Sequence, residues 1–408
     1  MDLMVTVSGV SEDVQSPAAV LPAWRRNLIV LILLTGGIKS TLAFTTVVPA
    51  LQLIAKEFAG STDAILSAQF VVTMAPIGMA IAGLLAGFLV SSTNLRGIMF
   101  ASLGICTVAG LMQLVLHNYY MLLGSRFILG FSAVIADVAM TSILAAQFTG
   151  ALRSKLIGYR QAISSIGTVG TMLLGGVLAQ HYGWRAPGIM FLLPGIMLIG
   201  AMIAFNQPVT LERSAPGEDR FSVWQLWPVF LLSLAMSIGH TMPSFQMPFL
   251  LKDNGVTSAV LVSRVPALSS AISILAAFAF GFVYARLGAW TLVISSTLMG
   301  VGFIGAGFAP SYELILLCVV IEGVGAGWTM PFFMNRVLDK VAPSQRSYAI
   351  GLVSTSLFLG HFLNPILTAP IRQNLGIHAT FVAVGLALVT IAVLIGAWTL
   401  FFRKSRAI

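Results

Sequence analysis

Long apolar runs, separated by short polar breaks, recur along the chain from residue 27 to residue 402. A helix needs about 20 predominantly apolar residues to cross a bilayer, and each run approaches or exceeds that length. The pattern therefore predicts twelve transmembrane helices, over residues 27–54, 64–90, 97–116, 119–148, 156–181, 187–206, 223–251, 258–284, 290–308, 311–338, 347–371 and 377–402. The longer runs indicate tilt or extension beyond the hydrocarbon.

The longest internal polar break divides the twelve runs into six and six, and matching motifs recur in the two sets. Gly87-Phe88 matches Gly281-Phe282, and Tyr120 matches Tyr312, at a nearly constant offset. Such repetition is typical of transporters built from internal repeats. We expect an all-α membrane protein of two pseudo-symmetric six-helix bundles. Its predicted parts are an N-terminal tail (1–24), a first bundle (25–206), a linker (207–222), a second bundle (223–402) and a C-terminal tail (403–408).

Composition agrees with a lipid environment, because 58% of the residues are hydrophobic and only 9% are charged. Soluble proteins carry roughly 25% charged residues. The two cysteines, Cys106 and Cys318, each lie alone in an apolar run, which predicts neither a disulfide framework nor a metal site. No Gly-x-x-x-x-Gly-Lys-Ser/Thr loop is present, so direct use of ATP is disfavoured, and no cofactor is expected.

The positive charges gather on one side of the predicted helices. With the N-terminus in the cytoplasm, fifteen of the 22 Lys and Arg residues fall on the inner side, four on the outer side and three inside spans. The four on the outer side are Lys56, Arg185, Lys252 and Arg372. This bias predicts both termini in the cytoplasm and a location in the cell membrane, inner or plasma. It also accounts for the net charge of +9 without a nucleic-acid partner.

The loop after the second span and its counterpart in the second bundle contain a recurring pattern. The first reads G87 F L V S S T N L R96, and the second reads GFVYARLGAW from Gly281, with Arg286 in it. This pattern, the six-plus-six repeat, and Arg126 followed four residues later by Gly130 resemble the Major Facilitator Superfamily. The resemblance implies that Gly87, Ser91, Arg96, Gly281 and Arg286 belong to gating loops. An acid that helps to latch the cytoplasmic gate in the family is absent from both loops, with Ser91 at its first position.

The same resemblance implies that the first, fourth, seventh and tenth helices line a central cavity. In the fifth helix Gly175 and Gly176 match part of an antiporter motif whose Gly-Pro is missing here. That departure weakens an inference of antiport, and the small residues also allow close helix packing.

Four ionisable residues lie deep inside predicted spans, namely Lys39, Arg126, Asp137 and Glu322. A charge at the bilayer centre costs roughly 2.5–3.5 kcal/mol, so we expect these groups to face one another or one water-filled cavity. Arg126 and Asp137 are eleven residues apart, which places them on the same helical face at different depths.

These residues supply the expected binding and coupling sites. The predicted substrate-binding residues are Lys39, Arg126, His240, Gln246, His361 and Asn364. Asp137 and Glu322 are the candidates for proton coupling, because a buried carboxyl group can change its charge whereas arginine stays protonated. Glu322 is preferred, since no cation lies near it in the sequence.

Each assignment has a structural alternative. Arg126 is equally suited to tethering backbone carbonyl groups. Lys39 can pair with Asp137 or Glu322 and simply hold helices together. His240 and His361 fit ordinary hydrogen-bonded interior positions.

The sequence as a whole predicts a monomeric secondary active transporter that works by alternating access. We expect it to couple to protons and to export amphipathic, drug-like compounds or organic anions. Proton symport or facilitated uptake of an organic anion is the alternative, and a receptor that binds solute without moving it is a more distant one. The thirteen acidic residues and five histidines form no convergent catalytic cluster, so an enzyme is not expected.

Overall fold

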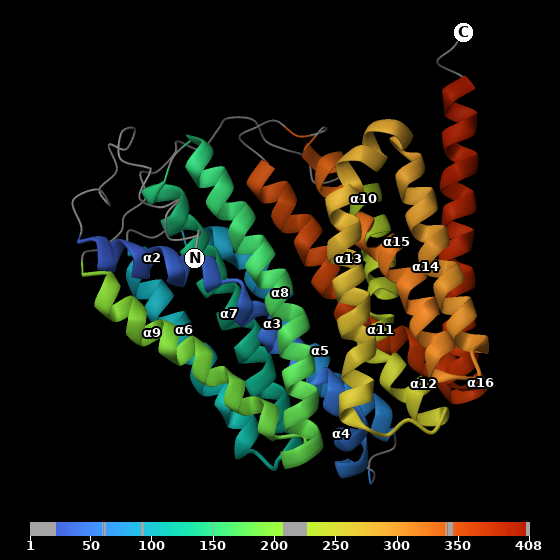
Figure 1. The fold of residues 1–408 in the computed structure, drawn as a ribbon, viewed down its shortest axis with the longest axis horizontal. Helices are drawn as coiled ribbons and strands as arrows, with labels where there is room; N and C mark the ends of the chain where they lie inside the picture. The colour runs from blue at the N-terminus through green and yellow to red at the C-terminus, as the bar shows by residue number, and fades with distance from the viewer. Residues whose placement is uncertain are drawn as a thin grey trace.

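The computed structural model describes residues 22–58, 60, 63–90, 94–148, 150–206, 227–338, 341 and 346–404, and every regular element in this part of the chain is a helix. The first half contains α2 (Ala23–Thr35), α3 (Ile38–Thr45), η2 (Val48–Ala50), α4 (Leu51–Glu57), α5 (Ala64–Leu89), α6 (Leu95–Leu111), η3 (Met112–Leu114), α7 (Tyr119–Gln147), α8 (Gly150–Tyr182), η4 (Ala186–Phe191) and α9 (Leu192–Ala204). Most of these elements form one lobe of the molecule, on the left of Figure 1, and α4 lies at the bottom, beside α12 (Met247–Asp253) of the second half.

The second half forms the other lobe (Figure 1). It contains α10 (Trp227–His240), α11 (Met242–Phe245), α12 (Met247–Asp253), α13 (Ala259–Leu287), α14 (Trp290–Phe308), α15 (Tyr312–Leu338) and α16 (Arg346–Lys404). Within α16 the backbone is not helical at Gly376, whose φ of 87° is open to glycine and rarely to other residues. Gly376 therefore divides α16 into two spans.

The described helices account for the twelve predicted spans. Ten segments are long and apolar enough to cross a membrane, and the last of them, residues 351–400, holds the two spans that Gly376 separates. The predicted span at residues 223–251 corresponds to α10, α11 and α12, which are individually short. The predicted linker, residues 207–222, and most of the two predicted tails lie outside the described residues.

Local sequence explains where several of these helices begin and break. Asp63, Asn94 and Asn118 cap α5, α6 and α7, each accepting a hydrogen bond from a backbone N–H three residues later. The seventh span breaks before Pro243 and again before Pro248, because proline lacks the N–H that a continuous helix needs. The first span is also broken, into α2, α3, η2 and α4, with Gly36 and Gly37 between α2 and α3 and Pro49 in η2.

The two halves share an apolar core at one end of the molecule. Leu51 and Ile54 of α4 pack in the same buried cluster as Phe245 and Leu250 from the second half. We call this end, which carries Asp63, the Asp63 end, and it lies at the bottom of Figure 1. The opposite end, which carries Arg96, is the Arg96 end. Large apolar side chains exposed on the outside include Ile166, Ile196, Leu275 and Phe278, as expected of a surface that faces lipid.

Candidate functional site

A cavity of about 250 Å³ lies between the two halves. The first half contributes Phe44, Ser165, Thr168 and Met172 to its wall. The second half contributes the polar residues His240, Thr241, Ser244, Ser269, Ser270, Ser273 and His361 and the apolar residues Pro243, Phe245, Pro266 and Ile274. Because both halves line it, a movement of one half against the other changes its shape and access.

Breaks in the seventh span place polar groups at this wall. His240 ends α10, Thr241 lies in the break that follows, and Ser244 belongs to the four-residue α11. Non-helical backbone at membrane depth is tolerated where it lines a cavity. The helix breaks that accompany Pro243 and Pro248 therefore occur where the seventh span passes the cavity.

His361 sits between aromatic rings from both halves. Its ring centroid lies 5.8 Å from that of Phe44, 6.2 Å from that of Phe245 and 6.1 Å from that of Phe358, all in edge-on geometry. Its Nδ1 lies 2.6 Å from the carbonyl oxygen of Leu357, which can only accept, so Nδ1 donates. In the neutral ring Nε2 is then a hydrogen-bond acceptor.

Lys39 and Asp137 form an ion pair, and a second cation joins them. The Lys39 Nζ is 3.2 Å from the Asp137 Oδ1, and an Arg160 guanidinium nitrogen is 2.6 Å from the same oxygen. Arg160 also donates to the hydroxyl of Thr141. Lys39 is fully buried and donates to the Gly36 carbonyl oxygen as well, whereas the Asp137 side chain is 35% exposed. We call Lys39, Asp137 and Arg160 the charged triad.

The contacts of Lys39 in the charged triad contradict its predicted role in substrate binding. Its ammonium group has two protein acceptors and no exposed surface, so it is not available to bind a substrate in this conformation. The alternative of a pair with Asp137 that holds helices together is the one found.

Arg126 lies elsewhere, and its predicted role in substrate binding is likewise corrected. Its guanidinium group donates to the Gln113 side chain and sits 6.0 Å from the centre of the Phe191 ring. Gln113 in turn donates to the carbonyl oxygen of Trp184 at 2.9 Å. Arg126 thus joins α7 to η3 and η4 inside the first half and does not line the cavity. It shares no contact with Asp137, because eleven residues on one α-helix span roughly 16 Å.

Glu322 is buried in the second half, one layer behind the cavity wall. Its Oε2 accepts a hydrogen bond from Ser269 at 2.8 Å, and Ser269 lines the cavity. Its Oε1 is buried and has no hydrogen-bond partner among the described residues. The four predicted ionisable residues therefore do not meet in one chamber, and that prediction is wrong for this conformation.

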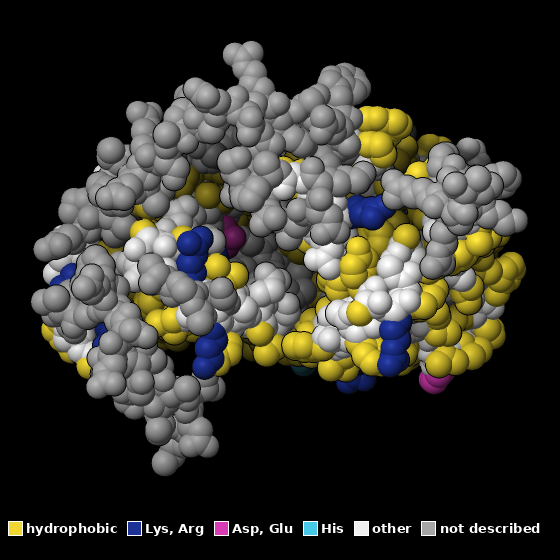
Figure 2. Space-filling view, turned by 90° about the horizontal axis from the view of Figure 1, so that it is seen from above, with side chains coloured by type: hydrophobic (Ala, Val, Ile, Leu, Met, Phe, Trp, Pro, Cys, Tyr) yellow, Lys and Arg dark blue, Asp and Glu magenta, His cyan; other side chains and the backbone are white. Residues whose placement is uncertain are grey.

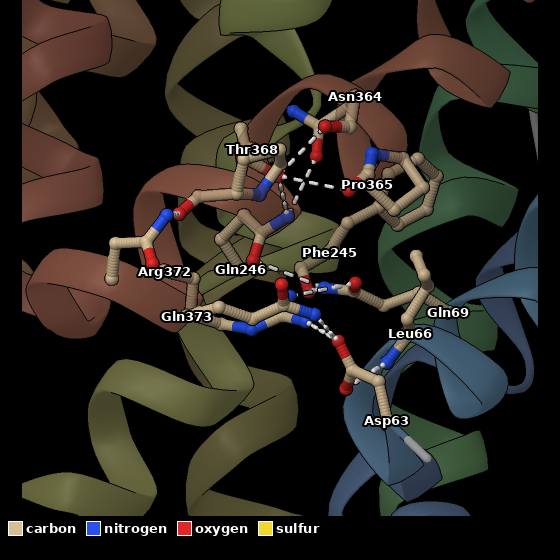
Figure 3. A network of polar contacts seen from close by, with 12 residues as sticks. Asp63, Leu66, Gln69, Phe245, Gln246, Asn364, Pro365, Thr368, Arg372 and Gln373 are labelled. Carbon is tan, nitrogen blue, oxygen red and sulfur yellow. Dashed lines mark hydrogen bonds and ion pairs between the residues drawn. The ribbon is translucent and has the colours of Figure 1, made fainter. Parts of the chain in front are cut away.

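A polar network closes the Asp63 end (Figure 3). Arg372 donates to the Asp63 carboxylate at 2.7 Å and to the Gln69 side chain at 3.0 Å, and Gln373 donates to Asp63 at 2.8 Å. Gln69 also donates to the Phe245 carbonyl oxygen at 2.9 Å. These contacts join α5 in the first half to α16 and α11 in the second, and we call Asp63, Gln69, Arg372 and Gln373 the latch.

Gln246 and Asn364 belong to the surroundings of the latch and not to the cavity wall. Gln246 accepts from Gln69 at 3.0 Å and donates to Asn364 and Thr368 at 3.0 and 2.6 Å. Both residues are fully buried. Their predicted role in binding substrate is therefore corrected to a role in closing the Asp63 end, whereas the predicted His240 and His361 do line the cavity.

The electrostatics of the latch follow from its hydrogen bonds. Partial burial alone acts to raise the pKa of Asp63, but hydrogen bonds from Leu66 and Gln373 and the charge of Arg372 outweigh it. The pKa of Asp63 is consequently lowered from its usual 3.8. The carboxylate is the stable form in the closed latch.

The Arg96 end has a different character. Seen from above, the molecule is hollowed between its two lobes (Figure 2). Arg96 donates to the Phe205 carbonyl oxygen at 3.3 Å, and Arg286 lies over the ring of Phe282 at 3.7 Å, so each bonds within its own half. Of the other predicted gating residues, Gly87 lies in the last turn of α5 and Gly281 lies in α13, while Ser91 lies outside the described residues. The hydrogen bonds between the two halves described above belong to the Asp63 end, whereas Phe44 and His361 meet across the halves at the cavity.

Comparison with known proteins decides the family. The profile of the Major Facilitator Superfamily matches residues 33–294 and 229–407. The chain belongs to the Major Facilitator Superfamily. It is therefore a member of a transporter family and not an enzyme.

Individual relatives are distant. The chain is 26% identical to the MFS-type transporter SLC18B1 of Mus musculus, over 69% of this chain and 62% of the relative. It is 22% identical to the riboflavin transporter RibZ of Clostridioides difficile, over 62% and 68%. It is 24% identical to the multidrug resistance protein MdtG of Proteus mirabilis, over 48% and 50%. The chain thus spans between half and about two thirds of the lengths of these relatives.

Solved structures confirm the fold. A D-xylose–proton symporter superposes with a TM-score of 0.74 at 15% identity, covering 90% of this chain and 97% of the symporter. The nucleoside transporter NupG gives 0.72 at 15% identity, covering 90% and 98%. At such identities the likeness concerns the fold alone.

The latch and Arg160 were missed by reasoning from the sequence. Asp63 and Arg372 both fall in loops predicted to lie on the outer side, and this shared location was the available signal. Arg160 was assigned to the inner side, but it lies ten residues inside α8, which begins at Gly150.

Proposed function

We propose that this protein carries a small organic solute across the cell membrane by alternating access, with proton coupling. The observation that carries the proposal is a cavity lined by both halves, closed at the Asp63 end by the latch and hollowed toward the Arg96 end. A carrier needs such a site with access from one side at a time.

The distribution of positive charge supports an orientation. Arg25, Arg96, Lys155 and Arg286 all belong to the Arg96 end, which the positive-inside rule places in the cytoplasm. In this proposal the structure is the inward-facing state, the latch is the extracellular gate, and both termini are cytoplasmic.

Glu322 is the residue that we propose carries the proton. It is a buried carboxyl group without a cationic partner among its described contacts, and Ser269 links it to the cavity. Asp137 is less suited, because Lys39 and Arg160 both stabilise its ionised form. A proton arriving from the cavity through Ser269 neutralises Glu322 without moving any other charge.

Proton flux in vesicles tests this assignment. Purified protein is reconstituted into liposomes with an imposed pH gradient, and solute movement is followed with and without Glu322→Gln. We expect Glu322→Gln to retain counterflow of solute between equilibrated compartments and to lose accumulation driven by the gradient. Undiminished gradient-driven accumulation in Glu322→Gln would remove Glu322 from the proposal.

The direction of transport that we propose is export, which the multidrug relative MdtG supports by its name. Uptake by symport is the alternative, and the riboflavin transporter RibZ shows that relatives include carriers of single defined compounds. Reversing the imposed gradient distinguishes the two. Export by antiport accumulates solute on the side where protons are abundant, whereas symport accumulates it on the opposite side.

A further inference from the structure

The cavity wall indicates the charge of the compound that it holds. The fifteen residues that line it include seven hydroxyl side chains and two histidines, and none of them is Lys, Arg, Asp or Glu. A charged group moved into a largely dehydrated site without an opposite charge costs several kcal/mol. The wall is therefore unsuited to an anion and to a permanent cation alike.

The charged residues near the cavity do not supply a counter-charge for an ionised ligand. Asp137 already has two cations within 3.2 Å, and Lys39 is fully buried against its own acceptors. Glu322 lies behind Ser269, whose hydroxyl hydrogen points to Glu322 and not to the cavity. An ionised ligand in the cavity would thus lack a direct counter-charge.

Several of the seven wall hydroxyl groups already donate their hydrogen to another group of the protein. Thr168 donates to the Ser164 carbonyl oxygen at 3.0 Å, Ser273 to that of Gly323 at 3.0 Å, and Ser269 to Glu322 at 2.8 Å. A hydroxyl group has one hydrogen and two lone pairs, so each of these keeps only acceptor capacity for a ligand. This wall fits a ligand that brings several O–H or N–H donors.

Aromatic side chains give the cavity an apolar face as well. Phe44 from the first half and Phe245 from the second both line it and flank His361. Flat rings pack well against such faces. The volume of about 250 Å³ is near the lower end of ordinary ligand pockets, which suits a compact compound.

We propose that the cavity binds an uncharged compound that joins a flat ring to a hydroxylated chain or sugar. This assignment deepens the proposed function and rests on it for the claim that the bound compound is also the one transported. It replaces the organic anion that the buried cations suggested in the sequence.

Direct binding tests the proposal without requiring transport. The full chain in lipid nanodiscs is titrated with riboflavin and with riboflavin 5′-phosphate, followed by flavin fluorescence, and with uridine and uridine 5′-phosphate, followed by calorimetry. The members of each pair differ only in the charged phosphate. We expect the uncharged member of at least one pair to bind roughly tenfold tighter or more, since an unpaired buried charge is costly.

Three outcomes of the binding measurements would overturn the proposal. One is that neither uncharged compound binds, and another is that the phosphates bind as tightly as their parents. The third is tighter binding of ethidium, an aromatic cation. Binding is measured at equilibrium without a gradient, so its result does not depend on whether Glu322→Gln vesicles lose or keep gradient-driven accumulation. The two proposals therefore fail separately.

A matched pair of variants locates the site. Thr168→Val removes a lining hydroxyl, whereas Thr107→Val removes one that likewise donates to the carbonyl oxygen four residues earlier but lies outside the cavity. We expect Thr168→Val to weaken binding of the preferred compound about fivefold, the effect of one lost hydrogen bond, and Thr107→Val to leave it unchanged. Equal affinities in both variants would place the compound elsewhere.

Discussion

Two carboxyl groups inside the membrane spans, one in each half, have opposite surroundings. Asp137 in α7 faces two cations, Lys39 from α3 and Arg160 from α8, and is partly exposed. Glu322 in α15 is fully buried with one serine hydroxyl as its partner and one oxygen unpaired. The two halves share a fold, but they do not share the placement of charge.

The different surroundings of Asp137 and Glu322 suit two different roles for a carboxyl group in a membrane, a fixed anion and a group that exchanges a proton. A carboxylate between two cations is stabilised as an anion, and its removal leaves like charges together. A carboxyl group with only a hydroxyl partner tolerates the neutral form, because burial disfavours its charge. We infer that the charged triad organises the first half and that the second half carries the exchangeable proton.

The largest expected effect is that of Asp137→Asn on stability. The change leaves Lys39 and Arg160 facing each other without a counter-charge. Breaking a fully buried pair costs about 3–5 kcal/mol, and we expect about 2–3 kcal/mol here, because the Asp137 side chain is 35% exposed. Thermal unfolding in detergent measures it.

Glu322→Gln is the matched control for Asp137→Asn. Glutamine keeps an oxygen that can accept from Ser269, so we expect a loss of less than about 1 kcal/mol. Equal destabilisation by the two variants would contradict the contrast between the acids.

A second prediction concerns the surplus cation of the charged triad. Lys39→Met leaves Asp137 and Arg160 as a neutral pair, so it should cost about 1–2 kcal/mol, less than Asp137→Asn. The double variant Lys39→Met with Asp137→Asn should be more stable than Asp137→Asn alone, because only one cation then remains without a counter-charge. A double variant whose loss is the sum of the two single losses would show that the charges do not interact.

The fold was predictable from the sequence because lipid imposes a simple length rule. Twelve apolar runs and one long polar break give the helices and the two halves without knowledge of any contact. The seventh span illustrates the limit of that rule. Its length was predicted, but it is broken at Thr241, which lines the cavity, and again at Gln246, and only the positions of Pro243 and Pro248 indicated these breaks.

The sequence could place a site residue only where knowing which helix carries it is enough to place it at the cavity. The placement of His240 at the cavity followed from the family's arrangement of helices, because the seventh helix is one of the four that line it, whereas His361 lies in the eleventh span, which that arrangement does not place there. Arg126 was wrongly predicted to bind substrate. The angle between two residues around a helix axis does not determine which neighbouring helix each side chain contacts. Asp63 and Arg372 are separated by 309 positions, and their pairing depends on how the two halves dock.

A third prediction contrasts the latch with the Arg96 end. Arg372→Gln removes the charged contact to Asp63 and one bond to Gln69. A hydrogen-bonded charge contributes about 1.5 kcal/mol or more, so we expect the population open at the Asp63 end to rise about tenfold. Distances between spin labels placed on α4 and α12 measure it by pulsed electron resonance.

Arg286→Gln is the control for the latch variant. Arg286 lies over Phe282 within its own half at the Arg96 end, so its replacement should leave the labelled distances unchanged. If both variants shift the distances equally, the latch has no special role in closing the Asp63 end.

The smallest expected effect is that of pH on the latch. The pKa of Asp63 is lowered from 3.8 by its hydrogen bonds and by Arg372, against the effect of burial. A lowered pKa stabilises the closed latch above about pH 4, and that contribution is lost only as the pH falls through the lower value in the closed state. The spin-label distances at the Asp63 end should therefore not change between pH 8 and pH 5 in Glu322→Gln, where the proposed proton site is absent. Opening of the latch within that range in this variant would show that the latch itself senses protons, and the division of labour between the two halves would then be wrong.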